Sequence, residues 1–273
     1  MARLADVIAA FERRYDPSWA AEWDTVGLVC GDPATDVTRV HFAVDPVEVV
    51  AAAAVAAGAQ LLVTHHPLFL GGTDSVAATT AKGRVVHQLV TNGAALYVAH
   101  TNADVAPADS VSDALAAAVG LTDVRRLDPV AELGLGRLGN LPAPVTLREF
   151  ADAAAKALPA TVWGVRASGD PDRMISTVAV AGGACGDLAE QAAAAGADVL
   201  LTSDLKHHRT SEAVADTGIA LIDAAHWATE HPWLAVAADL LGRDLADAGT
   251  TVECTVSSTV TDPFTLHAHS PGD

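Results

Sequence analysis

The stretch AQLLVTHHPLF, residues 59–69, decides how the rest of the chain is interpreted. Ala59–Thr64 consists mostly of apolar and β-branched residues between a glycine and a proline, which predicts a short buried strand. His65 and His66 follow at once, at the carboxyl end of that strand, which is the edge where open α/β sheets bind ligands. Imidazole is the commonest metal-binding side chain, so the pair indicates a metal site, although two surface-loop histidines would fit the same pattern.

Two further polar clusters also follow strand-like segments. An apolar run at residues 94–99 leads into HTNAD, and another at residues 219–222 leads into DAAHWATE. Carboxyl ends of parallel strands meet at one edge of a sheet, so three clusters of this kind can converge. The candidate ligands in the three clusters are His65 and His66, His100 and Asp104, and His226 and Glu230.

The spacing of the last pair suits a metal centre. His226 and Glu230 are four residues apart, so both side chains share one face if they lie in the first turns of a helix. A carboxylate such as Asp104 or Glu230 has two oxygens and can bridge two cations. Histidines combined with carboxylates match divalent Zn, Fe, Mn, Co or Ni. A solvated helix pair is the alternative for His226 and Glu230 taken alone.

The chain repeats itself weakly. Residues 40–66, VHFAVDPVEVVAAAAVAAGAQLLVTHH, match residues 178–204, VAVAGGACGDLAEQAAAAGADVLLTSD, at a constant offset of 138. NGAALYVA at 92–99 matches TGIALIDA at 217–224 at an offset of 125. Each half is therefore expected to run strand–helix–strand–helix–strand, which implies mostly parallel sheets covered by helices. Chance matches in an alanine-rich chain are the minority explanation.

This duplication predicts an α/β fold with two similar three-layer α/β domains. The first half spans residues 1–127 and carries the HH and HxxxD motifs; the connector and second half span 128–273 and carry HxxxE. A metal bound by both halves would sit in a cleft between them. Within the connector we expect strands at Gly136–Leu141 and Thr161–Ala167, and a helix at Thr146–Leu158 that Thr146 and Glu149 cap together.

Composition restricts the class of protein. The formal net charge of −18 and the lack of any Lys/Arg run argue against a nucleic-acid-binding surface. Three isolated cysteines predict a reducing compartment and no disulfide framework. Met1–Tyr15 has the spacing of an amphipathic helix, and the longest uncharged apolar stretch, Val49–Thr64, falls short of a membrane span. We expect a soluble cytoplasmic protein with no membrane partner.

Two other motifs leave alternatives open. Asp204–His208, in SDLKHH, occupies in the second half the place of the His65–His66 pair. This segment could line the substrate pocket, supply a phosphate-binding Lys206 or hold another metal. It could also be a plain helix start with Ser203 or Asp204 as N-cap. WDTVGL, beginning at Trp23, is either a turn and strand or a loop over the cleft.

Together these motifs resemble a known family. THHPLF at 64–69, HTNAD at 100–104, SDLKHH at 203–208, the H-x-x-x-E of 226–230 and WDTVGL at 23–28 are similar to the NIF-three-like dinuclear metal-centre proteins. These proteins are often described as GTP cyclohydrolase I type 2 homologues. The likeness spans essentially the whole chain. One departure is Ser203, where many members have glycine before the acidic residue.

The resemblance implies two similar, intertwined α/β domains and a homo-oligomer, a toroidal hexamer. It implies metal ligands at His65, His66, Asp104, His226 and Glu230, with His100 close by. The short connector implies that the extra central domain of some members is missing here.

Our leading hypothesis is a hydrolase with two divalent ions that acts on a small molecule, GTP or another nucleotide. His100 is the candidate catalytic acid or base, because it titrates near pH 7 and lies four residues from a ligand. The alternative from another class is a metal-binding regulatory or scaffold protein that forms a ring without turnover.

Overall fold

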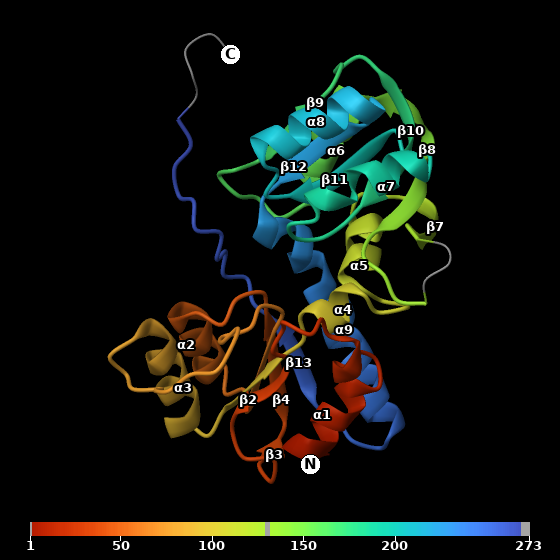
Figure 1. Cartoon of the computed structure of the whole chain (residues 1–273). Coiled ribbons are helices and arrows are strands. Elements are labelled where there is room, and N and C mark those ends of the chain that lie inside the picture. The colour runs from red at the N-terminus through yellow and green to blue at the C-terminus, as the bar shows by residue number, and fades with distance from the viewer. Residues whose placement is uncertain (1, 129–131, 269–273) are drawn as a thin grey trace. The chain divides into compact units, whose positions relative to one another are not determined.

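The computed structural model describes residues 2–128 and 132–268, which form two compact units (Figure 1). Unit 1 comprises residues 1–106 and 234–261, and unit 2 comprises 107–233 and 262–273. The chain thus leaves unit 1, builds unit 2 and returns within one helix, α9, which spans His226–Asp247. These two units are defined by contacts in space. The boundary predicted at residue 127 is defined by the sequence repeat, and it stays a prediction.

Unit 1 is built on a five-stranded sheet with the order β13-β4-β5-β6-β2. The four strands β13, β4, β5 and β6 are parallel, and β2 pairs antiparallel with β6 at the edge. The bounds are β2 Gly27–Cys30, β4 Arg39–Ala43, β5 Leu61–Thr64, β6 Ala95–Val98 and β13 Glu253–Val256. A separate two-stranded sheet pairs β1 (Ala2–Arg3) with β3 (Asp36–Val37).

Helices cover both faces of this sheet, as the lower part of Figure 1 shows. On one face, Leu62 and Leu96 of the sheet pack in a buried cluster with alanines and valines of α2 (Glu48–Ala56) and α3 (Ala81–Thr91). On the other, Phe11 of α1 (Leu4–Glu12) packs against Phe42 and Tyr97, with ring centroids 6.0 and 5.8 Å away. The alternation along β6 therefore supplies both layers of core. The predicted N-terminal helix is confirmed but begins at Leu4.

Unit 2 is built on a six-stranded sheet with the order β7-β8-β10-β11-β12-β9. The central strands β10, β11 and β12 are parallel, and the outer ones pair antiparallel. The strand bounds are β7 Thr122–Arg126, β8 Arg137–Thr146, β9 Val165–Ser168, β10 Met174–Val180, β11 Val199–Ser203 and β12 Ala220–Ala224. The helix bounds are α5 Val111–Ala118, α6 Leu147–Ala157, α7 Ala189–Ala194 and α8 His207–Thr217, and η2 Gly186–Leu188 is a short 3-10 turn.

Small side chains allow the helices of unit 2 to approach the sheet closely. Ala192 of α7 and Ala213 of α8 pack with Leu200 and Leu221 in one buried cluster. The helices α5 and α6 contact strands β8, β9, β10 and β12. The predicted capping box of α6 is confirmed, because the Thr146 side chain accepts from the Glu149 amide and Glu149 accepts from the Thr146 amide.

Two details of unit 2 differ from the sequence prediction. The strand expected from residue 161 begins only at residue 165, after Gly164, whose φ of +66° interrupts an extended backbone. Neither Ser203 nor Asp204 caps α8: the N-cap is Lys206, which makes no side-chain cap hydrogen bond. Ser203 is instead the last residue of β11, and Asp204 turns the chain with a φ of +54°.

The repeat is visible in the strand registers. In unit 1, Val40 lies opposite Leu61, and Leu61 opposite Ala95. In unit 2 the positions that the sequence offsets predict to correspond, Val178, Val199 and Ala220, pair in the same way. The predicted α/β class is therefore confirmed, with the order strand–helix–strand–helix–strand in each unit.

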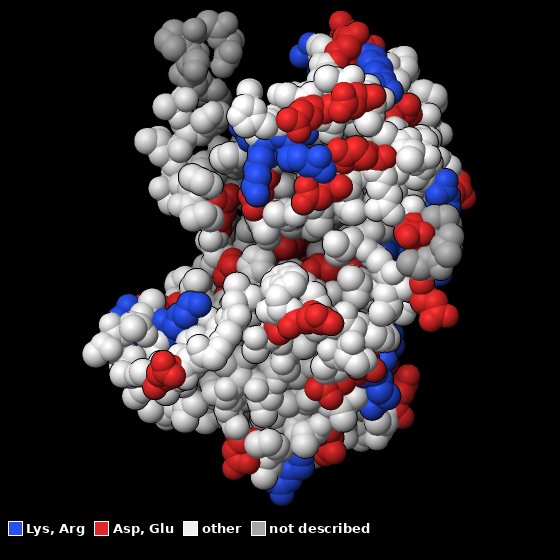
Figure 2. Space-filling view, viewed as in Figure 1, with Lys and Arg blue, Asp and Glu red and all other residues white. Residues whose placement is uncertain are grey.

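The surface agrees with the acidic composition. On the face shown in Figure 2, acidic side chains are scattered widely among a smaller number of basic ones. Within the described part of the chain, none of the helices combines the length and apolar character that crossing a bilayer requires.

Candidate metal centre

His65 is the most deeply placed of the candidate ligands. It follows β5, its side chain is fully buried, and its Nδ1 atom lies 2.9 Å from the carbonyl oxygen of Ala99 at the end of β6. The Nε2 atom lies 3.5 Å from Oδ1 of Asp104. A neutral imidazole that donates through Nδ1 presents the lone pair of Nε2, so His65 directs a possible ligand atom toward the Asp104 carboxylate.

His66 is held in the same way by a different acceptor. Its Nδ1 atom lies 2.7 Å from Oδ1 of Asp45, which follows β4. The other oxygen of Asp45 accepts a hydrogen bond from the Thr261 hydroxyl, so the carboxylate is itself fixed. A pocket of about 590 Å³ beside His66 is lined mainly by apolar side chains such as Val47, Leu68 and Val85. An organic molecule reaching His66 would therefore have an apolar wall next to it.

His100 depends on the WDTVGL motif. Its Nδ1 atom lies 3.0 Å from Oδ1 of Asp24, whose other oxygen accepts from the amide and hydroxyl of Thr101. Burial opposes the charge on Asp24, but the hydrogen bonds from Thr101 and His100 outweigh it, so the pKa of this carboxyl lies below its usual value. Burial, followed by the proximity of His65, lowers the pKa of His100. His100 is therefore neutral at pH 7, the form that binds a metal or accepts a proton.

These three histidines form one cluster in unit 1. Their possible ligand atoms all lie within 4.8 Å of one another, and the ring centroids are 5.2 to 5.7 Å apart. Asp104 closes the short helix α4, Thr101–Asp104, which begins directly after His100. Asn102 stabilises this turn by accepting from the His100 amide and donating to the carbonyl of Tyr15.

The candidate ligands of unit 2 lie at the end of β12 and the start of α9. His226 donates or accepts through Nδ1 at 2.7 Å from Oδ2 of Asp204, and its Nε2 lies 2.9 Å from Oε1 of Glu230. The predicted i, i+4 relationship on a helix is thus confirmed. Glu230 is 3% exposed, so its carboxylate faces the interior and not the solvent that the alternative of a solvated helix pair requires.

A glycine pair after β10 makes room for this carboxylate. A Cβ atom on Gly183 would lie 2.7 Å from Oε1 of Glu230 and 3.4 Å from Nε2 of His226. Gly183 also has a φ of +73°, and its amide donates to the Thr229 hydroxyl at 3.0 Å. A Cβ on Gly182 would lie 2.6 Å from the Val111 side chain. Only glycine therefore fits at this close approach of backbone to site.

All four imidazoles share one arrangement. Each has its Nδ1 atom anchored on an oxygen of the protein, namely Ala99 for His65, Asp45 for His66, Asp24 for His100 and Asp204 for His226. Metal-binding histidines almost always engage their second nitrogen with a carboxylate or carbonyl, which fixes the ring and raises its basicity. The nitrogen and oxygen donors fit divalent metals of the Zn, Fe, Mn, Co and Ni group. No disulfide bond joins the three cysteines, all of which lie in described parts of the chain.

The sequence reveals the imidazoles but not the residues that orient them. Asp24 stands out there only as part of a loop motif, and Asp45 and the Gly182–Gly183 pair only as part of the repeat. Asp204 fits a helix cap equally well. A signal exists for Asp204 and Asp45, since both directly follow predicted strands that neighbour a histidine-bearing strand. Asp24 lies 76 residues before its partner, with no periodic pattern between them.

Comparison with known proteins identifies the family. The model of the family Duf34/NIF3 (NGG1p interacting factor 3) matches residues 2–263. The chain belongs to this family. A Streptomyces coelicolor protein named GTP cyclohydrolase 1 type 2 homolog is 51% identical over 99% of this chain and 96% of its own length. A Mycobacterium bovis protein of the same name is 35% identical over 97% of both chains. That second alignment spans 373 positions, against the 273 residues of this chain, so the mycobacterial relative holds residues that have no counterpart here.

Solved structures support the fold of this family member. A Staphylococcus aureus hypothetical protein superposes with a TM-score of 0.89 at 26% identity, covering 97% of this chain and 99% of that one. A Bacillus cereus protein related to NIF3 superposes with a TM-score of 0.90 at 23% identity, covering 98% and 99%. The second likeness establishes the shared fold alone.

Proposed function

We propose that this chain is a metal-dependent hydrolase that binds two divalent ions through His65, His66, Asp104, His226 and Glu230. The observation that supports the proposal is the common anchoring of the imidazoles. Any buried imidazole needs a hydrogen-bond partner, but three of these four have a carboxylate on Nδ1, and a metal ligand gains orientation and basicity from such a partner. The absence of cysteine from these clusters favours a catalytic site over a closed structural zinc site.

The chemistry divides between the ions and the protein. Divalent ions of this kind, when bound, supply water of lowered pKa and stabilise negative charge on the attacked centre. His100 is neutral at pH 7 and fixed by Asp24, so its Nε2 atom is suited to accept a proton from a water or to return one to a leaving group. Asp24 keeps the ring in the tautomer that leaves Nε2 free for this role.

GTP or another nucleotide is the proposed substrate. The support is the name of the relatives, GTP cyclohydrolase 1 type 2 homolog, together with a site suited to hydrolysis. Opening the guanine ring at C8 requires addition of water, which this class of site supplies. The reaction and the metal site are separate claims, so they need separate measurements.

The test combines elemental analysis with a turnover assay. After reconstitution with Zn, Fe, Mn, Co and Ni in turn, the full chain should hold close to two ions, and GTP or a phosphoester should be consumed. His65→Ala, Asp104→Ala and Glu230→Ala should each lose metal, while Asp32→Ala, in an exposed turn of unit 1, should not. A chain that stays empty with every metal contradicts the proposal. Full metal without turnover of any nucleotide or phosphoester favours the scaffold alternative.

We further propose a homo-oligomeric ring, a hexamer, in the cytoplasm. Family resemblance supports the ring, and alanine-rich helices permit close contact between copies. Isolated cysteines support a reducing compartment. Light scattering that finds a monomer at every concentration would refute the ring.

A further inference from the structure

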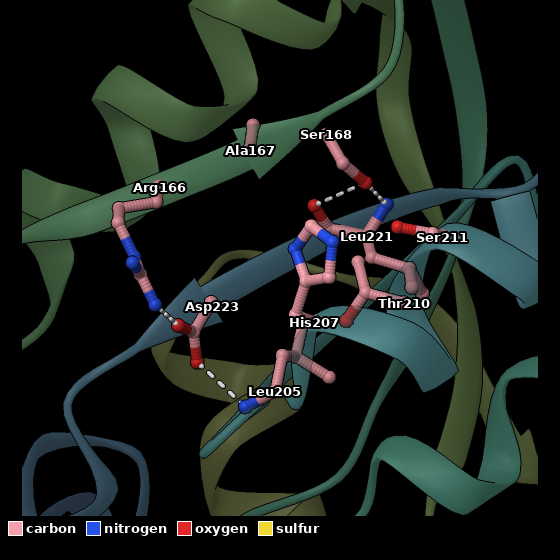
Figure 3. A pocket seen from close by; sticks show the side chains of 9 residues that line it. All are labelled: Arg166, Ala167, Ser168, Leu205, His207, Thr210, Ser211, Leu221 and Asp223. Carbon is pink, nitrogen blue, oxygen red and sulfur yellow. Dashed lines mark hydrogen bonds and ion pairs between the residues drawn. The ribbon is translucent and has the colours of Figure 1, made fainter.

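Unit 2 has a pocket of its own, distinct from the one beside His66. It does not include the candidate ligands His226 and Glu230. It has a volume of about 370 Å³ and lies between β9, β12 and the first turn of α8 (Figure 3). This volume falls within the range of about 300–1,000 Å³ that small-molecule sites occupy. Six of the nine lining residues are polar, and those that matter here are Arg166, His207, Thr210, Ser211 and Asp223.

Arg166 is held in place on two sides. Its guanidinium carbon lies 4.3 Å from the centre of the Trp163 ring, and it forms an ion pair with the buried carboxylate of Asp223. The second oxygen of Asp223 accepts from the amide of Leu205 at 3.3 Å. A guanidinium carries five N–H donors in a planar fork, so pairing with one carboxylate oxygen leaves donors for a ligand. Arg166 is thus oriented before a ligand arrives.

The opposite wall is the start of α8. Figure 3 shows His207 directed from this helix toward β9 and β12, with Arg166 on one side and Thr210 and Ser211 on the other. The Thr210 hydroxyl is buried and finds no hydrogen-bond partner among residues 2–128 and 132–268. A buried hydroxyl without a partner is costly, and a ligand oxygen in this pocket would satisfy it.

We propose that this pocket binds the phosphate group of a small-molecule substrate. An oxyanion accepts hydrogen bonds, and four of the lining residues, Arg166, His207, Thr210 and Ser211, carry N–H or O–H donors. Asp223, the one carboxylate among the lining residues, does not present an unpaired negative charge, because it pairs with Arg166 and accepts from the Leu205 amide.

Residues that line the pocket are close in sequence to the candidate ligands of unit 2. Asp223 lies three residues before His226, and Leu205, in the pocket wall, follows Asp204, which holds His226. A phosphorylated molecule seated here would lie at the same strand-end edge as His226. That the bound molecule is a substrate rests on the proposed function, whereas phosphate binding by these residues does not.

The test is equilibrium dialysis of the full chain, metal-loaded and after EDTA treatment, with inorganic phosphate, glycerol phosphate and GMP as probes. Arg166→Gln should weaken binding of every probe about tenfold or more, because it removes a charged hydrogen-bond donor. Thr210→Val keeps the shape and should weaken binding while leaving the melting temperature unchanged or higher. Arg173→Gln is the control, since Arg173 pairs with Asp198 in unit 2 and lines no part of this pocket.

The outcomes separate this proposal from the hydrolase proposal. Binding to metal-free protein that depends on Arg166 and Thr210 supports the phosphate subsite, even if no turnover is found. Binding that needs metal and ignores both substitutions overturns the subsite and leaves the metal centre intact. Equal affinity for glycerol phosphate and GMP, or tighter binding of GMP, both support recognition of the phosphate; binding of none of the probes overturns it.

Discussion

The Nδ1 atom of His100 lies 3.0 Å from a carboxylate oxygen of Asp24, a residue 76 positions earlier in the chain. The same carboxylate accepts two hydrogen bonds from Thr101, so one acidic side chain fixes both the imidazole and the helix turn that follows it. The Asp24 side chain is fully buried, and it keeps its charge because these donors surround it. Asp24 is therefore a positioning residue for His100.

Substitution of Asp24 by asparagine tests this role. In Asp24→Asn, the amide nitrogen would face the donors of Thr101 or of His100, so one hydrogen bond is lost and the ring is freed. We expect hydrolysis to fall about tenfold to a hundredfold, the range for residues that orient a site from behind, with both metals retained. Asp32→Asn, in an exposed turn, is the matched control. Loss of metal in Asp24→Asn would make His100 a ligand and not an acid or base.

The sequence alone could predict the candidate ligands but not the side chains that orient them. Strand ends, the i, i+4 pair and the internal repeat are local or periodic signals. They indicate the candidate residues of the site, namely His65, His66, His100, Asp104, His226 and Glu230. The orienting partners depend on tertiary contact. Among 34 acidic residues, nothing local marks Asp24 as different from a solvated surface carboxylate. The need for glycine at Gly183 likewise arises only once Glu230 has been placed against it.

The buried ion pair between Arg137 and Asp113 predicts a large stability effect in unit 2. Arg137 is 2% exposed and meets Asp113 through two hydrogen bonds of 2.6 and 2.8 Å. Asp113→Asn replaces a carboxylate partner of a buried guanidinium by a neutral amide and weakens the cap of α5, so the free energy of unfolding should fall by about 3 kcal/mol or more. Asp187→Asn, whose side chain is 91% exposed beside Arg209, should change it by less than about 0.5 kcal/mol. Urea denaturation measures both, and equal effects would contradict the prediction.

His41 predicts how stability depends on pH. Its Nδ1 atom meets the Thr255 hydroxyl at 2.8 Å, while its Nε2 is buried with no hydrogen-bond partner in the described chain. Burial lowers the pKa of His41, so the unfolded chain binds the proton more readily than the folded one. The stability gained by burying neutral His41 is therefore fully present above the ordinary pKa of 6.5. It is lost as the pH falls toward the lower pKa of the folded state, because the unfolded chain takes up the proton first.

The measurement compares wild type with His41→Leu between pH 8 and pH 5. The difference in unfolding free energy should shift against the wild type as pH falls, by at most about 1.4 kcal/mol per pH unit. His87→Leu, in an exposed position on α3, is the matched control for the change of side chain. Parallel curves for wild type and His41→Leu would show that this histidine does not titrate differently in the folded state.

Substitution of Gly183 allows the cost of a strained backbone to be distinguished from displacement of the Glu230 carboxylate. Gly183→Ala places a Cβ 2.7 Å from Oε1 of Glu230, in a backbone conformation with φ of +73°. Gly196→Ala is the matched control, because Gly196 has a φ of +88° but a Cβ added there would have no neighbour within 4 Å. Both substitutions should cost about 1 kcal/mol of stability from the left-handed backbone alone. Only Gly183→Ala should displace the Glu230 carboxylate and reduce metal content, as elemental analysis would measure. Equal metal content in the two variants would mean that the carboxylate can move aside without loss, and that Glu230 is not needed as a ligand.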